Sequence, residues 1–439
     1  MPEPLVRLPD GTVKQVSPLT GTVVWTVPGR AHRPLGGPTE DRRRVDASSA
    51  DRLCAFCADR YLETPPEKSR LVVSADGTWS VLRDVAAEHL TDTVPQLRRI
   101  PNLFEILPVD YWRKNHGYVV PAEVLDRARS YTATSQGRSH VLAILRRRLT
   151  AAGMTDREWA STGEDARAGE HGVDLFAGSH DVIVARRHVI DGAAFDDELA
   201  GSGTLTADEH HRYVIFTIQA LRDLYAAQPH ARYVAVFQNW LRPAGASFDH
   251  LHKQLVAIDE HGPETDRELG RLRDDPDLFT TAVVDHAATH RLVVAENDHA
   301  IAVAGVGHRY PAIEVYSTSE HHRPWEHTDD EVRAVSDLLH AVHAATGTHV
   351  PTNEEWHHRP PDVAEAMPWR IVLKWRVSTL AGFEGGTRIN VNTIDPSALR
   401  DQVVAELHRL REAGAIGPMH LGDECSHRLG ALGYARGGR

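Results

Sequence analysis

The interpretation of the chain depends on one stretch, Phe237-Gln-Asn-Trp-Leu-Arg-Pro-Ala-Gly-Ala-Ser-Phe-Asp-His-Leu-His-Lys-Gln-Leu255. A turn of small residues leads into His250, His252 and Gln254, which occupy alternate positions. Because side chains alternate between the two faces of a β-strand, a strand here places all three on one face. Two imidazoles and an amide beside backbone donors can hold a phosphate group, attack its phosphorus and stabilise the charge. The alternative is a half-exposed strand whose polar residues face water.

The segments around this stretch form a pattern that occurs twice. The first copy consists of expected strands at 79–83 and 181–185, a helix at 207–226, and strands at 233–239 and 250–258. The second copy consists of expected strands at 290–295, 300–304 and 312–317, a helix that begins after residue 328, and an apolar strand at 368–377.

Both expected helices begin with the same signal, Thr206-Ala-Asp-Glu209 and Thr328-Asp-Asp-Glu331, in which the Thr hydroxyl and the Glu carboxylate cap free backbone donors. The repeated order predicts an α+β protein of two related domains, residues 1–262 and 263–439, each an antiparallel sheet with packed helices. Apolar residues at helical spacing near 110–178 predict a helical segment inserted into the first domain.

Composition excludes several classes of protein. The 439 residues carry a net charge of −12, which argues against a nucleic-acid-binding protein that depends on excess Lys and Arg. The chain has no apolar run of about 18 residues and no basic start followed by an apolar core, so neither a membrane span nor a signal peptide is expected. Three cysteines are too few for a disulfide framework. We therefore expect a cytoplasmic protein with no nucleic-acid or membrane partner.

Cys54 and Cys57 have the C-x-x-C spacing that indicates metal or redox chemistry in a cytosolic protein. Such a pair supplies two of the four N or S ligands that Zn²⁺ prefers. The alternative is a pair of buried thiols.

At these residues the chain resembles the galactose-1-phosphate uridylyltransferase branch of the histidine triad superfamily, in which an Asn and a Gly/Ser loop precede H-x-H-x-Q. The resemblance covers most of the chain outside the insertion and implies duplicated domains of the histidine triad (HIT) type. Further segments follow in the family's order: 17–25, 29–34, 54–57, 64–67, 99–102, 179–184 and 382–390.

The resemblance implies a role for each matching residue. His252 matches the nucleophile that takes up the nucleotidyl group, and Gln254 matches the amide that steadies the adduct. A neutral imidazole attacks readily and leaves readily, so it divides one transfer into two displacements. The matching substrate-binding residues are Asn102, Asn239 and Ser247, together with Arg30 and Arg33 near the diphosphate; a solvated turn is the alternative for the arginine pair.

The resemblance also implies one structural zinc site formed by Cys54, Cys57, His188 and His250, with His180 as the alternative to His188. The family's second domain often has a histidine-bearing strand that contributes to a second metal site. The matching stretch here, 368–376, contains no histidine, so a second metal is not expected.

The arginine and lysine residues of that stretch suggest another partner. Arg370, Lys374 and Arg376 share one face of the expected strand. They are compatible with a polyanionic acceptor, or with a solvated sheet face.

The two positions between His250, His252 and Gln254 also depart from the family, because the uridylyltransferases typically have Pro and Gly there. These positions point away from the active face. We expect Leu251 to pack inward and Lys253 to face solvent.

These observations predict a nucleotidyltransferase that moves a nucleoside monophosphate from a nucleoside diphosphate-sugar, or a similar anhydride, to a phosphate-bearing acceptor through a phospho-histidine intermediate. One alternative is a phosphorylase or adenylyltransferase acting on an ADP-sugar or a dinucleoside polyphosphate. A second is a zinc-stabilised nucleotide-binding protein without turnover. The resemblance also suggests a homodimer, although no segment identifies an interface.

Overall fold

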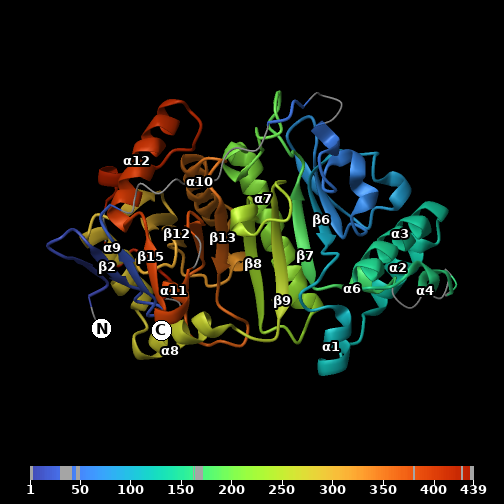
Figure 1. Cartoon of the computed structure of the whole chain (residues 1–439), viewed down its shortest axis with the longest axis horizontal. Helices are drawn as coiled ribbons and strands as arrows, with labels where there is room; N and C mark the ends of the chain where they lie inside the picture. Colours follow the sequence, from blue (N-terminus) through green and yellow to red (C-terminus); the bar gives the residue numbers. More distant parts are fainter. Residues whose placement is uncertain are drawn as a thin grey trace.

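The computed structural model of this chain describes residues 3–29, 42–45, 50–161, 163, 172–378, 381–426 and 429–435. Most strands belong to one large sheet (Figure 1). Its N-terminal half contains β4 (Ser69–Val73), β5 (Trp79–Arg83), β6 (Pro95–Pro101), β7 (His180–Ala185), β8 (Tyr233–Trp240) and β9 (His252–Ile258). Its C-terminal half contains β10 (Val293–Glu296), β11 (Ala300–Ala304), β12 (Ala312–Ser317), β13 (Thr352–His357), β14 (Arg370–Trp375) and β16 (His420–Leu421).

The described strands of this sheet follow the order β16-β10-β11-β12-β14-β13-β8-β9-β7-β6-β4-β5, and neighbouring strands are antiparallel. A small second sheet contains β1 (Leu5–Arg7), β2 (Val13–Val16), β3 (Val23–Thr26) and β15 (Ile389–Asn392), where β15 runs parallel to β3. The predicted α+β class with antiparallel sheets is confirmed. Residues near both ends of the chain meet in the small sheet.

The large sheet is symmetric in its order about the contact between β8 and β13. Moving outward, one side has β9, β7 and β6, and the other has β14, β12 and β11. At the centre Asn239 of β8 lies opposite Asn353 of β13. The expected strands of both copies are present, but β13 was not predicted because its sequence, TNEEWH, is mostly polar. The division of the chain at residue 262 stays a prediction.

Two long helices, α7 (Ala207–Ala227) and α10 (Asp329–Thr346), pack against each other and against the sheet. Both begin with the predicted capping boxes. Lys253 of β9 approaches the ring of Tyr213 on α7, and Glu354 of β13 accepts a hydrogen bond from His343 on α10. Because strand side chains alternate, the neighbouring residues His252, Gln254, Asn353 and Glu355 face the opposite side of the sheet.

The inserted segment is helical, as predicted (Figure 1, right). It contains α1 (Val109–His116), α2 (Ala122–Thr132), α3 (Ser135–Ala151), α4 (Asp156–Ser161) and α6 (Asp174–Ala177). Tyr131, Val141, Ile144, Leu145 and Phe176 contribute to a small hydrophobic core of its own. The insertion therefore has internal packing apart from the main core.

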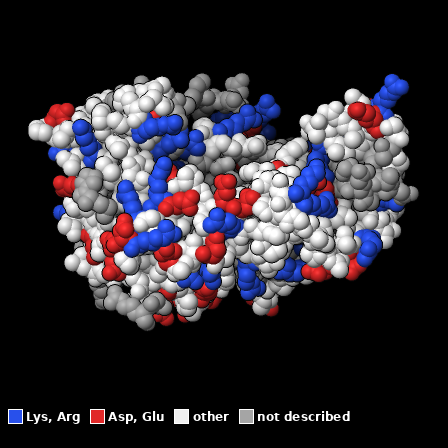
Figure 2. Space-filling model, turned by 90° about the horizontal axis from the view of Figure 1, so that it is seen from below, with Lys and Arg blue, Asp and Glu red and all other residues white. Residues whose placement is uncertain are grey.

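The remaining α-helices described are α8 (Pro263–Asp274), α9 (His286–Thr289), α11 (Gly382–Thr387) and α12 (Pro396–Glu412). Over the residues described, no helix combines the length and apolar character needed to cross a bilayer. Figure 2 shows Lys and Arg interspersed with Asp and Glu on the face that it draws, without a broad field of one sign.

Candidate active site and metal centre

The C-x-x-C residues lie between two short 3₁₀ helices, η1 (Ala50–Arg52) and η2 (Ala58–Glu63). This loop brings both sulfurs to His188, which follows β7, and to His250, which precedes β9. The four candidate ligand atoms all lie within 4.8 Å of one another. The two sulfurs are 3.8 Å apart, Cys54 Sγ lies 3.5 Å from His250 Nδ1, and Cys57 Sγ lies 3.6 Å from His188 Nδ1.

These distances fit a tetrahedral metal site. Zinc bonds of about 2.3 Å to sulfur and about 2.0–2.1 Å to nitrogen imply tetrahedral edges of about 3.8 Å between sulfurs and about 3.6 Å between sulfur and nitrogen. The other ring nitrogen of His250, Nε2, donates a hydrogen bond to the carbonyl oxygen of Ala185 at 2.6 Å. Such a bond orients a ligating imidazole and fixes its tautomer. The four residues can therefore hold a metal ion.

The other histidine considered as a ligand, His180, belongs to a different cluster. Its Nδ1 accepts a hydrogen bond from the backbone of Ile106 at 3.3 Å, so its proton is on Nε2. That Nε2 donates to Gln254 Oε1 at 3.0 Å, and Asn102 Nδ2 lies 3.4 Å from the same oxygen. The amide oxygen of Gln254 is thus held by the side chains of His180 and Asn102, and among the residues that the structure describes its nitrogen has no hydrogen-bond acceptor.

His252 begins β9 and is 4% exposed. Its Nδ1 donates to the carbonyl oxygen of His250 at 2.7 Å, which leaves Nε2 as the unprotonated nitrogen. Burial lowers the pKa of His252 to about 4, against the opposing effect of that hydrogen bond. The ring is consequently neutral near pH 7, the form in which an imidazole is nucleophilic.

The metal-binding loop also touches the predicted nucleophile. The ring of Phe56, between the two cysteines, meets the His252 ring edge to face at 5.2 Å and the Phe248 ring at 4.7 Å. Phe56 therefore shields His252 and connects its position to the cysteine loop. No sequence pattern indicates this contact beyond the location of Phe56 inside C-x-x-C.

The loop between β8 and β9 is tightly turned. Leu241 has φ 65° and ψ 155°, a region that residues other than glycine rarely adopt, and Gly245 has φ 91°. The backbone N–H groups of Ala244 and Ala246 both bond to the Leu241 carbonyl oxygen. Strained backbone of this kind concentrates at functional sites.

The remaining predicted substrate-binding residues have different locations. Ser247 is exposed on this loop, and Asn239 Oδ1 accepts a hydrogen bond from Asn353 Nδ2 at 2.7 Å. Asn353, which sequence reasoning missed, joins the loop to the C-terminal half. Arg30 and Arg33 lie outside the described residues.

The expectation for Lys253 was wrong. Leu251 is buried as expected, but Lys253 is also fully buried, on the helix side of the sheet. Its Nζ lies 2.5 Å from Glu354 Oε1 and 3.2 Å from Gln238 Oε1. Burial of a lysine requires such partners, and these are supplied by strands whose pairing the sequence did not reveal.

Comparisons with known proteins agree with this fold. An ADP-glucose phosphorylase from Arabidopsis thaliana is 28% identical over 173 residues, which are 37% of this chain. The matched stretch spans only 49% of that relative's length.

Two solved structures cover far more of the chain. They are a crystal structure of an ADP-glucose phosphorylase from Arabidopsis thaliana with bound ADP-glucose and a structure of a GalT-like protein from the same plant. Each covers 89% of this chain and 97% of the other, with a TM-score of 0.55 and 19% identity. The expected resemblance to the galactose-1-phosphate uridylyltransferase branch is confirmed at the level of the fold.

A family model matches almost the whole chain, residues 8–434, and is described as "Domain of unknown function (DUF4921)". The match covers both copies of the repeated pattern and the candidate site. The chain therefore belongs to the DUF4921 family.

Proposed function

We propose that this protein is a nucleotidyltransferase that uses His252 as its nucleophile. The observation that carries the proposal is the state of the His252 ring: buried, neutral, with Nδ1 engaged and Nε2 unprotonated. Gln254, two residues further along the same strand face, has its oxygen held by His180 and Asn102. A fixed nucleophile beside a fixed amide donor suits attack on phosphorus.

The proposed reaction has two displacements. His252 Nε2 attacks the α-phosphorus of a nucleoside diphosphate-sugar; a nitrogen–phosphorus bond forms, the anhydride bond breaks, and sugar phosphate leaves with the bridging oxygen. A phosphate oxygen of the acceptor then attacks the same phosphorus, and the nitrogen–phosphorus bond breaks. The Gln254 amide nitrogen stabilises charge on the phosphoryl oxygens. Arg30 and Arg33 are proposed to contact the diphosphate.

A phosphorylase is the second candidate, favoured because the similar proteins are named ADP-glucose phosphorylase. In this version the donor is an ADP-sugar and the acceptor is inorganic phosphate. The chemistry at His252 is the same in both versions, so the acceptor that discharges the adduct distinguishes them.

Intact-protein mass spectrometry tests the proposal. Brief incubation with ADP-glucose or UDP-glucose should add the mass of one nucleoside monophosphate, and the preferred donor identifies the base. Inorganic phosphate should discharge the adduct of a phosphorylase, whereas a hexose 1-phosphate should discharge that of a sugar-phosphate nucleotidyltransferase.

The control variants are His252→Asn and Arg409→Gln, an exposed arginine paired with Glu406 on α12. The adduct should be absent from His252→Asn and unchanged in Arg409→Gln. An equal adduct in His252→Asn would refute His252 as the nucleophile. Tight nucleotide binding with neither adduct nor exchange of label would support a binding protein without turnover.

We also propose that Cys54, Cys57, His188 and His250 hold one structural zinc ion, which would tie the 50–63 loop to the ends of β7 and β9. Native mass spectrometry should find one zinc ion per chain, and Cys57→Ser should lose it while His252→Asn keeps it. A zinc ion retained by Cys57→Ser would refute this ligand set. The homodimer and the cytoplasmic location stay predictions.

A further inference from the structure

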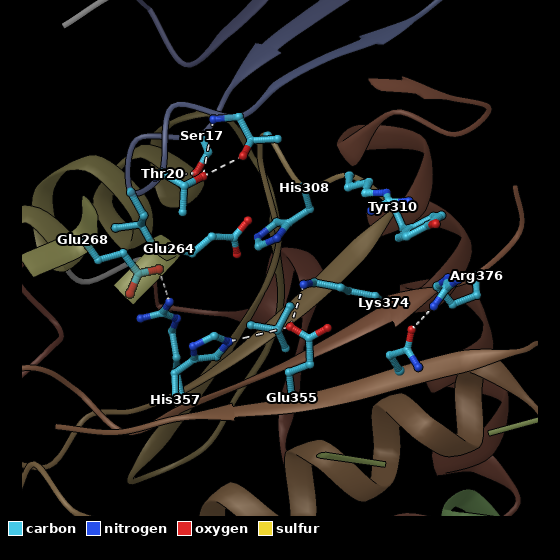
Figure 3. Close-up of a pocket in the computed structure, with 17 residues that line it drawn as sticks. Ser17, Thr20, Glu264, Glu268, His308, Tyr310, Glu355, His357, Lys374 and Arg376 are labelled. Carbon is cyan, nitrogen blue, oxygen red and sulfur yellow. Dashed lines mark hydrogen bonds and ion pairs between the residues drawn. The ribbon is translucent and has the colours of Figure 1, made fainter. Parts of the chain in front are cut away.

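A second cavity lies in the C-terminal half, on the same face of the sheet as His252. It encloses about 250 Å³. Its floor comes from β13 and β14, and its walls come from α8, the 307–310 loop and the 17–22 turn (Figure 3). The volume corresponds to roughly eight water molecules at about 30 Å³ each, so the cavity suits a small ligand.

Unsatisfied buried groups line this cavity. Arg370, 2% exposed, donates through Nη2 to Glu268 Oε1 of α8 at 2.5 Å. Within the described chain, Arg370 Nε and Nη1 and Glu268 Oε2 have no hydrogen-bond partner. Native proteins rarely bury polar atoms without a partner, because burial removes the hydrogen bonds that these atoms would make with water. The three atoms are therefore suited to a polar ligand.

Cationic side chains surround the same space. Lys374 Nζ lies 2.6 Å from Glu355 Oε2, and Arg376 Nη1 donates to Asn353 Oδ1 at 2.5 Å. Arg376 and Arg309 both lie against the ring of Tyr310, at 4.6 and 5.3 Å. Among the residues that the structure describes, neither Arg309 nor Arg376 has a carboxylate partner. This side of the cavity can therefore accept a negative charge.

The other lining groups suit hydroxyls. Glu264, His308 and Lys374 point toward a common space in Figure 3, and Ser17 and Thr20 lie on the wall above it. Carboxylates and imidazoles accept hydrogen bonds from hydroxyls, and the serine and threonine groups can donate or accept. A metal ion fits poorly, because Arg370 and Lys374 already neutralise Glu268 and Glu355.

We propose that this cavity is a second ligand site, which binds a small hydroxyl-rich phosphate ester such as a sugar phosphate, with the phosphate beside Arg309 and Arg376. The cavity is centred on β13 and β14, whereas His252 begins β9. β14 is three strands from β9, which corresponds to about 14 Å at the usual strand spacing. A ligand filling the cavity would therefore not also occupy the position of His252.

The cavity still contacts the active-site loop through hydrogen bonds. Asn353 accepts from Arg376 in the cavity and donates to Asn239 at the start of the loop. A ligand at Arg376 would thus contact a side chain that is bonded to Asn353, and Asn353 is bonded in turn to Asn239 of the candidate active site.

Calorimetric titration with glucose 1-phosphate tests the proposal, with free glucose and inorganic phosphate as separate probes. The protein carries His252→Asn, so that no turnover contributes heat. Glucose 1-phosphate should bind more tightly than either probe. Arg376→Gln and Arg309→Gln should each weaken its binding at least ~10-fold, Arg376→Lys should restore part of it, and Arg409→Gln should leave it unchanged.

Arg309 is exposed, so its variant tests the site even if Arg376→Gln fails to fold. Equal affinity in Arg309→Gln and Arg409→Gln, or no binding up to ~10 mM, would overturn the proposal. Binding that is insensitive to Arg309→Gln but lost in Gln254→Ala would place the ligand in the candidate active site instead. The adduct test of the proposed function does not depend on any of these outcomes.

Discussion

β9 and β14 occupy corresponding positions in the two halves of the large sheet, yet they carry different chemistry. His252 begins β9 opposite Val184 of β7, and Arg370 begins β14 opposite Tyr316 of β12. The first half thus has a neutral imidazole where the second has a permanently charged guanidinium held by Glu268. An imidazole can attack phosphorus, whereas a guanidinium can only bind an anion. The same scaffold is therefore proposed to carry out the reaction in one half and to bind a ligand in the other.

Two lysine–glutamate pairs of almost equal length meet at β13, one with its lysine on β9 of the N-terminal half and one with its lysine on β14 of the C-terminal half. Lys253–Glu354 is 2.5 Å long with both side chains 0% exposed, and Lys374–Glu355 is 2.6 Å long with side chains 17% and 35% exposed. The first pair lies beneath the candidate active site, and the second lies in the cavity. Because the two distances are nearly equal, comparing the pairs isolates the effect of burial on the free energy of unfolding.

The largest effect is expected from Lys253→Met. It leaves the Glu354 carboxylate buried without its cation, so unfolding free energy should fall by about 3–5 kcal/mol. Lys374→Met, at the partly exposed pair, should cost less than about 1 kcal/mol. Urea unfolding measures both. Replacing Glu354 as well, in Lys253→Met/Glu354→Gln, should recover part of the loss; equal losses in the two single variants would contradict the comparison.

The next effect concerns Glu314 of β12, beside the cavity. Burial raises its pKa, but the charge and hydrogen bond of His308, the charge of Arg370 and a hydrogen bond from Tyr316 outweigh burial and lower it from 4.5 to about 2. The native state therefore favours the carboxylate. The stabilisation that this carboxylate gives the native state is complete above pH 4.5 and is lost as the pH falls toward 2.

Between pH 7 and pH 3, wild type should accordingly lose about 2 kcal/mol more unfolding free energy than Glu314→Gln. Urea unfolding at the two pH values measures the difference, and the remaining carboxyl groups affect both proteins alike. Parallel losses would show that Glu314 is not held as a carboxylate in the native state.

A smaller effect is expected at His180, which positions Gln254. His180→Ala should slow adduct formation by ~10–100-fold because the Gln254 amide is no longer fixed. Zinc content should be unchanged, and His180→Gln, which keeps an N–H donor, should regain part of the rate. His188→Ala should instead lose the zinc ion. Loss of zinc in His180→Ala would contradict the separation of the two clusters.

The smallest effects are expected at the capping boxes. Thr206→Ala and Thr328→Ala each remove one side-chain acceptor at the start of α7 and α10, where the Thr oxygen bonds the Glu209 or Glu331 N–H at 3.2 or 3.3 Å. Each substitution should lower the free energy of unfolding by about 1 kcal/mol. The loss should be nearly equal in the two halves. Thermal unfolding of the two variants measures this, and a clear difference would show that the helix starts are not equivalent.

Local patterns predicted the elements with strong periodic signals. Residues 79–83, 300–304 and 312–317 are strands with the expected bounds, and both capped helices begin where the Thr-x-x-Glu spacing places them. These predictions succeed because capping and side-chain alternation depend on neighbours in sequence. β13 could not be predicted in this way, because Glu354 is stabilised there by Lys253, Trp356 and His343, two of which lie on other elements.

The sequence by itself determined the chemistry available to this protein: a thiol pair at C-x-x-C spacing, two histidines and a glutamine at alternate positions, and two capped helices in a repeated order. Only the tertiary structure decided which groups meet. It joined His188 to the cysteines, turned His180 toward Gln254, buried Lys253 on Glu354, and gathered Arg309, Arg370 and Arg376 around one cavity. Contacts of this kind depend on strand pairing between distant segments. That pairing is set by packing across the whole sheet rather than by residue type.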